Sequence, residues 1–227
     1  LDAHRVGRPL LLTTALASWR TIPPDDAELL GRSVDWVNVM TYDLGGGIWG
    51  SAATHNTPLP VIQEQVRSNW AVFTPDQLCI GLANYGFRYA GVSPGRSGEL
   101  PLAETGRYFS HTELSALFDQ GWTEWYDEEA QAPYVFSPDR SSFVTIDNNR
   151  SHARKLDWIL TRGYRGVFWW EFHCDYVPPR PGSRYAVHPL IDPVSERIGL
   201  PRRGAQGNRG SNGGWPHDAQ ELLEALP

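Results

Sequence analysis

A tyrosine and an aspartate lie at the end of one apolar run of this sequence and could take part in chemistry. The run Val34–Tyr42 reads VDWVNVMTY, and Asp43 and a glycine-rich loop follow it. Side chains alternate along a strand, so Met40 and Tyr42 would point to the same side. In an α/β barrel the carboxyl ends of the strands face the active site. The alternative is that this Tyr-Asp pair is structural.

Four short apolar runs supply elements that could position such groups. Each is dense in β-branched or aromatic residues, which is typical of strands buried on both faces of a parallel sheet. The runs are Pro9–Leu16, Val34–Tyr42, Gln77–Tyr85 and Gly166–Phe172. The segments between them predict helices over Asp25–Arg32, Leu59–Val72 and Ser151–Arg162. This alternation predicts an α/β fold with a parallel sheet.

The stretch Phe87–Ile146 interrupts the alternation and reads as an inserted α+β subdomain. Its strand-like and helical pieces are Thr123–Tyr126, Pro133–Phe136, Ser142–Ile146 and the short helix His111–Asp119. The remaining strand–helix units span about 140 residues, whereas a (β/α)8 barrel needs about 250. They fit half of such a barrel or a small open sheet. Beyond Leu200 the chain is rich in Gly, Arg and Asn, which indicates a flexible tail.

The composition narrows the possible partners. The 227 residues carry a net charge of −6 without long charged runs, which argues against nucleic acid. No apolar stretch reaches the roughly 18 residues of a membrane span.

We expect the two cysteines, Cys79 and Cys174, to be unbonded, because their predicted places on neighbouring strands lie about 15 Å apart. The 10 Trp, 9 Tyr and 8 Phe fit either an aromatic core or a sugar-binding cleft.

Several blocks, in the correct order, resemble glycoside hydrolase family 18, the chitinase family. Met40, Tyr42 and Asp43 match the family's M-x-Y-D at its sixth strand. The next blocks resemble the G-H-N-x-P-L loop, the seventh strand, the end of the chitinase insertion with the helix after it, and the eighth strand. They are His55–Leu59, Gly81–Gly86, Trp125–Tyr134 with Ile146, Asp147 and Ser151–Lys155, and Gly166–Asp175. Departures from the pattern are Thr54 for glycine, Phe87 for arginine with Arg88 one place later, and Phe168 for methionine.

The resemblance implies the C-terminal half of a TIM (β/α)8 barrel, strands five to eight, with an inserted α+β subdomain. The half-barrel would comprise residues 1–86 and 147–200, the chitinase insertion 87–146 and a flexible tail 201–227. The family's catalytic string D-x-x-D-x-D-x-E does not occur in these 227 residues. We therefore expect the general acid upstream of Leu1, in a missing N-terminal half. The acidic cluster Asp127-Glu128-Glu129 has the wrong spacing and is interpreted as a solvated turn.

The resemblance also implies substrate-assisted, retaining hydrolysis of β-1,4-linked N-acetylglucosamine polymers. Tyr42 would donate its hydroxyl to the acetamido oxygen, and Asp43 would hydrogen-bond the distorted sugar. Aromatic and apolar side chains would line the cleft: Trp170 beneath that sugar, Met40 in the pocket, Trp49 at a neighbouring subsite, and Tyr85 and Arg88 at the wall. No metal or organic cofactor is required. The expected partners are chitin or its oligosaccharides, and the expected location is extracellular.

A second function stays open, namely an inactive chitin- or oligosaccharide-binding pseudo-enzyme that keeps the aromatic residues without the acid. Several nearby residues have structural interpretations. We expect Trp169 in the core, His55 holding its loop, Glu171 in a salt bridge and Asp175 bonded to nearby loops. The insertion should lie at the carboxyl ends of the strands and form one wall of the groove.

Overall fold

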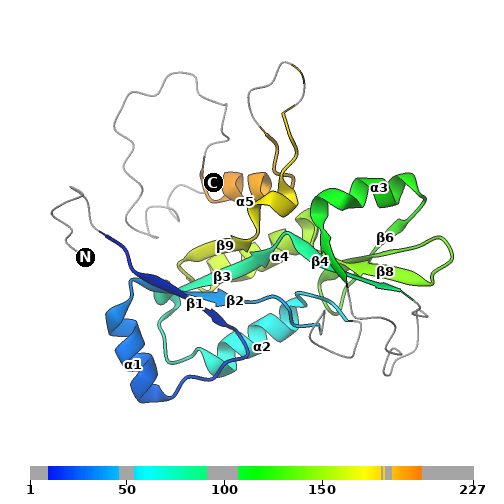
Figure 1. The fold of residues 1–227 in the computed structure, drawn as a ribbon. Coiled ribbons are helices and arrows are strands. Elements are labelled where there is room, and N and C mark those ends of the chain that lie inside the picture. The colour runs from blue at the N-terminus through cyan, green and yellow to red at the C-terminus, as the bar shows by residue number, and fades with distance from the viewer. Residues whose placement is uncertain (1–9, 46–53, 91–106, 180, 182–185, 201–227) are drawn as a thin grey trace.

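The computed structural model describes residues 10–45, 54–90, 107–179, 181 and 186–200 (Figure 1). These residues form one parallel and one antiparallel sheet, and the chain passes directly from the first to the second at Asn84. Trp49, part of the insertion and the whole tail 201–227 lie outside the described residues. No helix in the described part is long and apolar enough to cross a membrane.

The parallel sheet contains four strands in the order β1-β2-β3-β9. They are β1 (Thr13–Ala17), β2 (Trp36–Met40), β3 (Leu78–Ala83) and β9 (Gly166–Trp170), which confirms the four predicted strands. The helices between them are α1 (Pro24–Ser33), α2 (Leu59–Asn69) and α4 (Asn149–Thr161), again as predicted. Asn148 begins α4 by accepting a hydrogen bond from the Ser151 amide at 3.0 Å, as an N-cap residue does.

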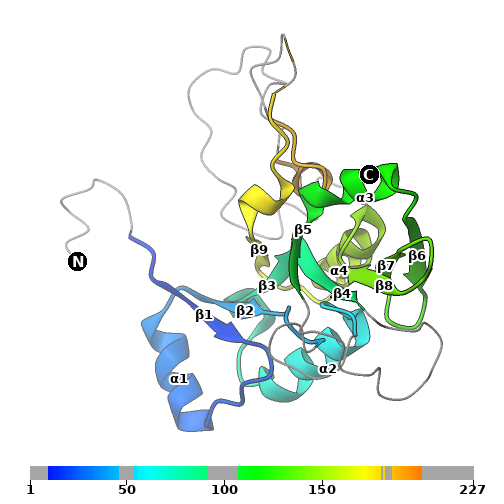
Figure 2. The ribbon, with the colours of Figure 1, turned by 45° about the vertical axis from the view of Figure 1, so that its right-hand side comes forward.

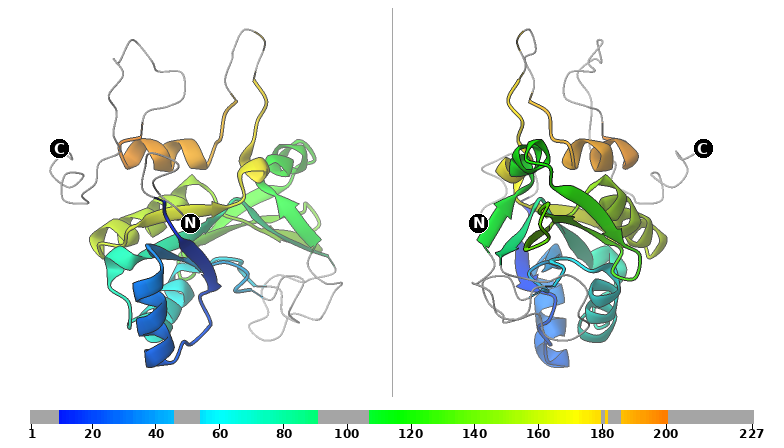
Figure 3. Two further views of the ribbon diagram at one scale, coloured as in Figure 1. Left: turned by 60° about the vertical axis from the view of Figure 1, so that its left-hand side comes forward. Right: turned by 90° about the vertical axis from the view of Figure 1, so that its right-hand side faces the viewer.

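One face of the parallel sheet packs against these helices and forms the main core. Alternate strand residues such as Val39, Ile80 and Leu82 meet Ile62 of α2 and Leu156 of α4, and all are fully buried. Burial of this kind stabilises the fold by about 25 cal/mol per Å² of apolar surface. Figures 2 and 3 show α1 and α2 along one side of the sheet.

A short helix, α5 (Ile191–Arg197), joins this core and was not expected from the sequence. Val194 and Ile198 pack into the main core, and Arg197 pairs with Asp157 of α4. Pro193 in its first turn reads as a loop signal, which explains why the pattern did not predict it. Figure 3 shows α5 on the side of the molecule away from α1 and α2.

The antiparallel sheet has five strands in the order β5-β4-β8-β7-β6. They are β4 (Tyr85–Ala90), β5 (Arg107–Ser110), β6 (Thr123–Asp127), β7 (Ala132–Phe136) and β8 (Ser142–Thr145), with the short helices η3 (His111–Glu113) and α3 (Leu114–Asp119). The last three strands and the helical segment were predicted, whereas β4 and β5 were not. Tyr85 begins β4 and does not continue β3, so the second sheet starts two residues before the expected boundary at 87. Gly86 permits this, since a Cβ there would lie 1.5 Å from the Thr145 carbonyl oxygen.

Both cysteines are free, as expected, and both are buried. Cys79 lies in β3, and Cys174 lies in η4 (Phe172–Asp175), the short helix beyond the carboxyl end of β9. The remaining short helix is η2 (Pro75–Gln77), just before β3. The strands β1 and β9 form the two edges of the parallel sheet, also as expected.

Candidate active site

The face of the parallel sheet opposite the three helices carries most of the candidate residues. Val37 and Val39 point into the main core, so Met40 and Tyr42 point to the other face by alternation. Met40 and Phe168 are partly buried there, packed against the cluster that contains Tyr42. The structure therefore gathers side chains from β2 and β9 on one face, at the carboxyl ends of the strands.

Tyr42 lies at the centre of this group. Its ring is 5% exposed and meets Tyr85 and Phe168 edge-on, with centroids 5.9 and 6.2 Å away. Its hydroxyl is buried and has no hydrogen-bond partner among the described residues. Burial, and secondly the charge of Asp43, raises the pKa of Tyr42 well above its ordinary value. The phenol therefore stays protonated and can donate to a ligand oxygen.

Gly81 makes room for the Tyr42 ring. A Cβ at this position would lie 2.8 Å from the ring of Tyr42 and 3.1 Å from that of Phe168. The Gly81 carbonyl accepts a hydrogen bond from the Thr41 hydroxyl at 2.6 Å, which fixes the backbone just before Tyr42. Sequence reasoning matched Gly81 to the seventh strand but did not find this role.

Asp43 is held in a left-handed backbone conformation, with φ of 61°. Such a φ is uncommon outside glycine and persists only where surrounding contacts impose it. The Asp43 amide donates to Asn56 Oδ1 at 2.8 Å, and its carboxylate accepts from the Tyr85 hydroxyl at 2.5 Å. Asn56 also donates to the Tyr85 carbonyl at 3.1 Å. Burial raises the pKa of Asp43, and the Tyr85 hydrogen bond opposes that rise.

Trp170 ends β9 and is 50% exposed, on the same face as Phe168. Its carbonyl accepts from the Asn84 amide at 2.9 Å, which holds the strand end beside β3. Trp169 points the other way and packs against the main core, as expected. The half-exposed indole of Trp170 is therefore available to a ligand.

The side chains of Tyr85 and Arg88 lie on opposite faces of β4. Tyr85 faces the group around Tyr42 and stacks on Tyr108 of β5, with centroids 4.9 Å apart. Arg88, three residues along β4, points to the opposite face and lies over the Trp122 ring at 4.8 Å. The structure thus joins Tyr85 to the candidate site through Asp43 and separates Arg88 from it.

His55 connects its loop to the antiparallel sheet, in agreement with its expected structural role. Its Nε2 lies 3.1 Å from Asp127 Oδ2. Burial lowers the pKa of His55, partly offset by Asp127. Asp127 also accepts from the amides of Glu129 and Ala130 at 2.9 and 3.0 Å, so the acidic cluster forms a turn. Asp175, as expected, bonds a neighbouring loop, since it accepts from the Leu190 and Ile191 amides.

A buried ionic network lies behind the site and was not recognised from the sequence. The ammonium of Lys155 in α4 contacts the carboxylate of Asp147 and donates to the Thr57 hydroxyl at 2.8 Å. Thr57 and Ser151 donate to the same carboxylate at 2.7 and 2.6 Å. His152 lies 3.6 Å from it. The network ties together the loop after β2, the end of β8 and the start of α4.

Burial disfavours both charges of this network. It lowers the pKa of Lys155, an effect that the Asp147 carboxylate opposes. Burial by itself would raise the pKa of Asp147, but the Lys155 ammonium and His152 bring that pKa far below its usual range. The signal in the sequence was Lys155 itself, which shares the core-facing side of α4 with Leu156 and Ile159. A lysine at such a position requires a partner.

We expect Lys155→Met to destabilise the protein by about 3–5 kcal/mol, because the Asp147 carboxylate would stay buried without its ammonium. Urea unfolding of the purified protein measures this loss. Adding Asp147→Asn should recover most of it, since the amide oxygen can still accept from the Ser151 hydroxyl and the amide nitrogen can donate to the Thr57 hydroxyl. Arg150→Met, which breaks the exposed pair with Glu128, is the matched control and should cost no more than about 1 kcal/mol.

The loss of stability caused by Lys155→Met should also depend on pH. Because the pKa of Asp147 is depressed in the fold, its stabilising contribution is complete above about pH 4 and is lost as the pH falls through the folded-state pKa. The difference between wild type and Lys155→Met should therefore shrink below pH 4. A cost under 1 kcal/mol at pH 7, or a difference that grows in acid, would contradict the assignment.

The fold has counterparts among glycoside hydrolases. The structure of a family 18 N-acetylglucosaminidase from Paenibacillus barengoltzii matches with a TM-score of 0.67 and 27% identity, over 86% of this chain and 58% of that one. A probable endochitinase of Caenorhabditis elegans is 25% identical over 87% of this chain, and an oviduct-specific glycoprotein of Sus scrofa 26% identical over 78%. The matches span 36% and 37% of these two relatives, so the chain corresponds to about a third of their length.

The family itself is shown by a match to the sequence profile of Glycosyl hydrolases family 18 over residues 3–175. The chain belongs to this family. The match covers both sheets, from before β1 to the end of η4.

Proposed function

We propose that the chain is the C-terminal half of a chitinase barrel, corresponding to its strands five to eight. Residues 1–86 and 147–200 would form the half-barrel, 87–146 the chitinase insertion and 201–227 a flexible tail. The parallel order β1-β2-β3-β9, with helices packed on one face, supports this interpretation. The substrate would be chitin or another polymer of β-1,4-linked N-acetylglucosamine, which agrees with the names of the endochitinase and N-acetylglucosaminidase relatives. The protein would act outside the cell.

The observation that carries the proposal is the buried hydroxyl of Tyr42, which has no hydrogen-bond partner among the described residues. An unsatisfied buried hydroxyl costs about 1–3 kcal/mol, which a ligand oxygen would recover. In the substrate-assisted route the acetamido oxygen of the sugar attacks its own anomeric carbon. The bond to the leaving oxygen breaks as an acid protonates that oxygen. Tyr42 would hold the acetamido oxygen during this step, as donors of an oxyanion hole do.

Neighbouring residues would complete the sugar site. Asp43, oriented by Asn56 and Tyr85, would accept a hydrogen bond from the sugar. Trp170, half exposed on the same face, would stack beneath the ring, with Met40 filling the pocket. Trp49 remains a candidate for a neighbouring subsite. No metal or organic cofactor takes part in this reaction.

The insertion would form one wall of the groove. Tyr85 begins β4 directly beyond the carboxyl end of β3, and its ring meets Tyr42. The antiparallel sheet therefore stands next to the proposed sugar site and would extend the contact with a longer oligosaccharide. Arg88, which packs on Trp122, is no longer included in this wall.

The general acid would come from outside this chain, because D-x-x-D-x-D-x-E does not occur in its sequence. A barrel completed by the N-terminal half would bring that acid to the leaving oxygen. The second candidate function is an oligosaccharide-binding pseudo-enzyme. The missing string together with the retained, exposed Trp170 favours this alternative.

Replacement of Trp170 tests the sugar site under both functions. We expect Trp170→Ala to weaken binding of N-acetylchitotriose by about tenfold, since stacking of this kind contributes on the order of 1 kcal/mol. Titration calorimetry with purified protein measures the affinity. Trp125→Ala is the matched control, because Trp125 is equally exposed at 48% but lies on β6, at the far edge of the antiparallel sheet. Equal effects of the two substitutions would refute the assignment.

A further inference from the structure

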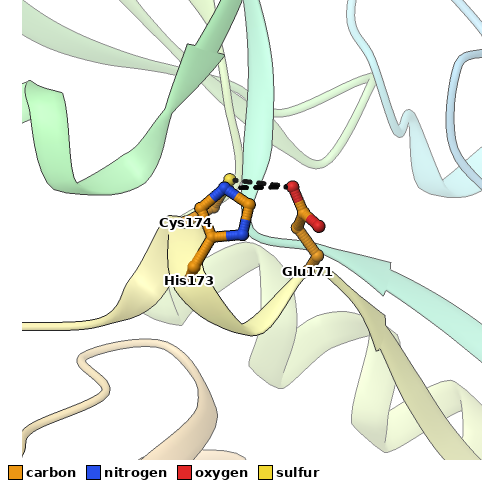
Figure 4. A group of neighbouring side chains, drawn as sticks. All are labelled: Glu171, His173 and Cys174. Atoms are coloured by element: carbon orange, nitrogen blue, oxygen red, sulfur yellow. Dashed lines mark hydrogen bonds and ion pairs between the residues drawn. The ribbon is translucent and has the colours of Figure 1, made fainter.

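Three side chains with metal-binding atoms converge just beyond the end of β9. They are Glu171, His173 and Cys174, whose ligand atoms all lie within 4.8 Å of one another. Figure 4 shows them turned toward one another from η4 and the residue before it. Residues three apart in a 3₁₀ turn lie one above the other, which places Glu171 and Cys174 on the same side.

The two distances from the Glu171 carboxylate suit a single tetrahedral ion. Glu171 Oε1 lies 3.2 Å from His173 Nε2 and 3.8 Å from Cys174 Sγ. Zinc binds oxygen and nitrogen at about 2.0–2.2 Å and sulfur at about 2.3 Å, so ligand atoms around it are about 3.3–3.6 Å apart. These two distances are within a few tenths of an ångström of that spacing. His173 Nε2 and Cys174 Sγ lie within 4.8 Å of each other, and rotation of the exposed His173 side chain would bring the imidazole closer to the sulfur.

A neighbouring phenol supports the same interpretation independently. The Tyr108 hydroxyl lies 2.9 Å from Cys174 Sγ and 3.3 Å from Glu171 Oε1. It can orient both atoms, in the way that hydrogen-bonding groups behind metal ligands do. Tyr108 is itself held by stacking on Tyr85. Cys174 is fully buried, so its thiol is positioned by the fold.

The charges of the three side chains and the exposure of His173 also suit a divalent cation. A carboxylate and a thiolate bring two negative charges, which a dication neutralises, and a neutral imidazole adds none. The His173 side chain is 74% exposed, and a shallow hollow lined by Phe172, His173, Tyr176 and His188 opens beside it. His173 would thus meet the ion from the solvent side, where water would take the fourth position.

We propose that Glu171, His173 and Cys174 form a zinc site, with Tyr108 as a positioning residue behind it. The site is separate from the reaction proposed above, which requires no metal. It begins one residue after Trp170, so a bound ion would hold the backbone that carries this indole. A thiol binds zinc only as the thiolate, so it must lose its proton when the ion binds. Zinc binding must therefore release a proton to solvent.

Titration of the metal-free protein with Zn²⁺, by calorimetry in two buffers of different ionisation enthalpy, tests the proposal. We expect one Zn²⁺ per chain and release of about one proton at neutral pH. Cobalt(II), used as a spectroscopic probe, should give a thiolate-to-metal charge-transfer band. His173→Ala and Cys174→Ser should each weaken Zn²⁺ binding by at least about a hundredfold, and Tyr108→Phe by about tenfold.

Two variants distinguish the loss of a zinc ligand from a general disturbance of the fold. His173 is exposed, so His173→Ala removes a ligand without disturbing packing. Cys79→Ser removes the other buried thiol and should leave the affinity unchanged. The absence of stoichiometric binding, a cobalt spectrum without the thiolate band, or equal affinities for wild type and Cys174→Ser would each overturn the zinc site. Oligosaccharide binding by metal-free protein reports separately on the proposed function.

Discussion

A protein of these 227 residues alone should show no turnover of a chromogenic chitotrioside. Protonation of the leaving oxygen by a positioned acid contributes about 10²–10⁴ in rate. The string D-x-x-D-x-D-x-E, to which the resemblance assigns this acid, does not occur in these 227 residues. Tyr42 cannot replace it, because its raised pKa makes it a poor acid toward a leaving alkoxide. Release of chromophore, followed over hours with purified protein, measures the activity.

Glu171 is the carboxyl group in the chain that most needs to be excluded as the acid. It follows Trp170 directly but contacts His173 and Tyr108. Its pair with His173 agrees with the expected salt bridge. Turnover that Glu171→Gln or Asp43→Asn abolishes would show that the acid lies within this chain. Turnover restored only by adding the N-terminal half of a family barrel would support the proposed division of the site.

The same protein should not behave as a monomer at low micromolar concentration. Both edges of the parallel sheet, β1 and β9, are open in the described structure. Leu11 and Leu12, just before β1, are 63% and 56% exposed. Several hundred Å² of apolar surface left in water forfeits on the order of 10 kcal/mol, which equals the whole stability of a typical domain. Dimerisation, aggregation or a requirement for the N-terminal half should follow.

Sedimentation velocity distinguishes these outcomes. Leu11→Lys should shift the distribution toward smaller species, since a charge blunts an exposed strand edge. Leu29→Lys is the matched control, because Leu29 is 67% exposed but lies on α1, away from the edge. A sharp monomer boundary with cooperative thermal unfolding of the wild type would contradict the prediction.

The sequence predicted the parallel sheet well because its strands are short, apolar and separated by amphipathic helices. The runs that become β1, β2, β3 and β9 carry this signal locally. The path of the chain at Asn84 could not be predicted in this way. The apolar run continues through this residue, and contacts distant in sequence set the start of β4: Tyr85 pairs with Ser110, and Gly86 approaches Thr145.

The candidate site likewise contains some residues whose positions local sequence predicts and others whose positions it does not. Met40, Tyr42 and Trp170 share one face, as strand alternation requires. The separation of Arg88 depends on the register of β4, which local sequence does not reveal. Tyr108 and Asn56 act through bonds to residues far away in the chain, so no local pattern marks them.

The buried network around Lys155 also bears on the order in which the chain folds. Its hydrogen bonds from Thr57 to Asp147 and from Lys155 to Thr57 span 90 and 98 residues, whereas the hairpin β6–β7 closes locally. Closing a loop of about 90 residues costs about 2 kcal/mol more than closing one of about 10. The network should thus assemble late, after the barrier to folding has been crossed. Loss of Lys155 would accelerate unfolding and leave the rate of folding nearly unchanged.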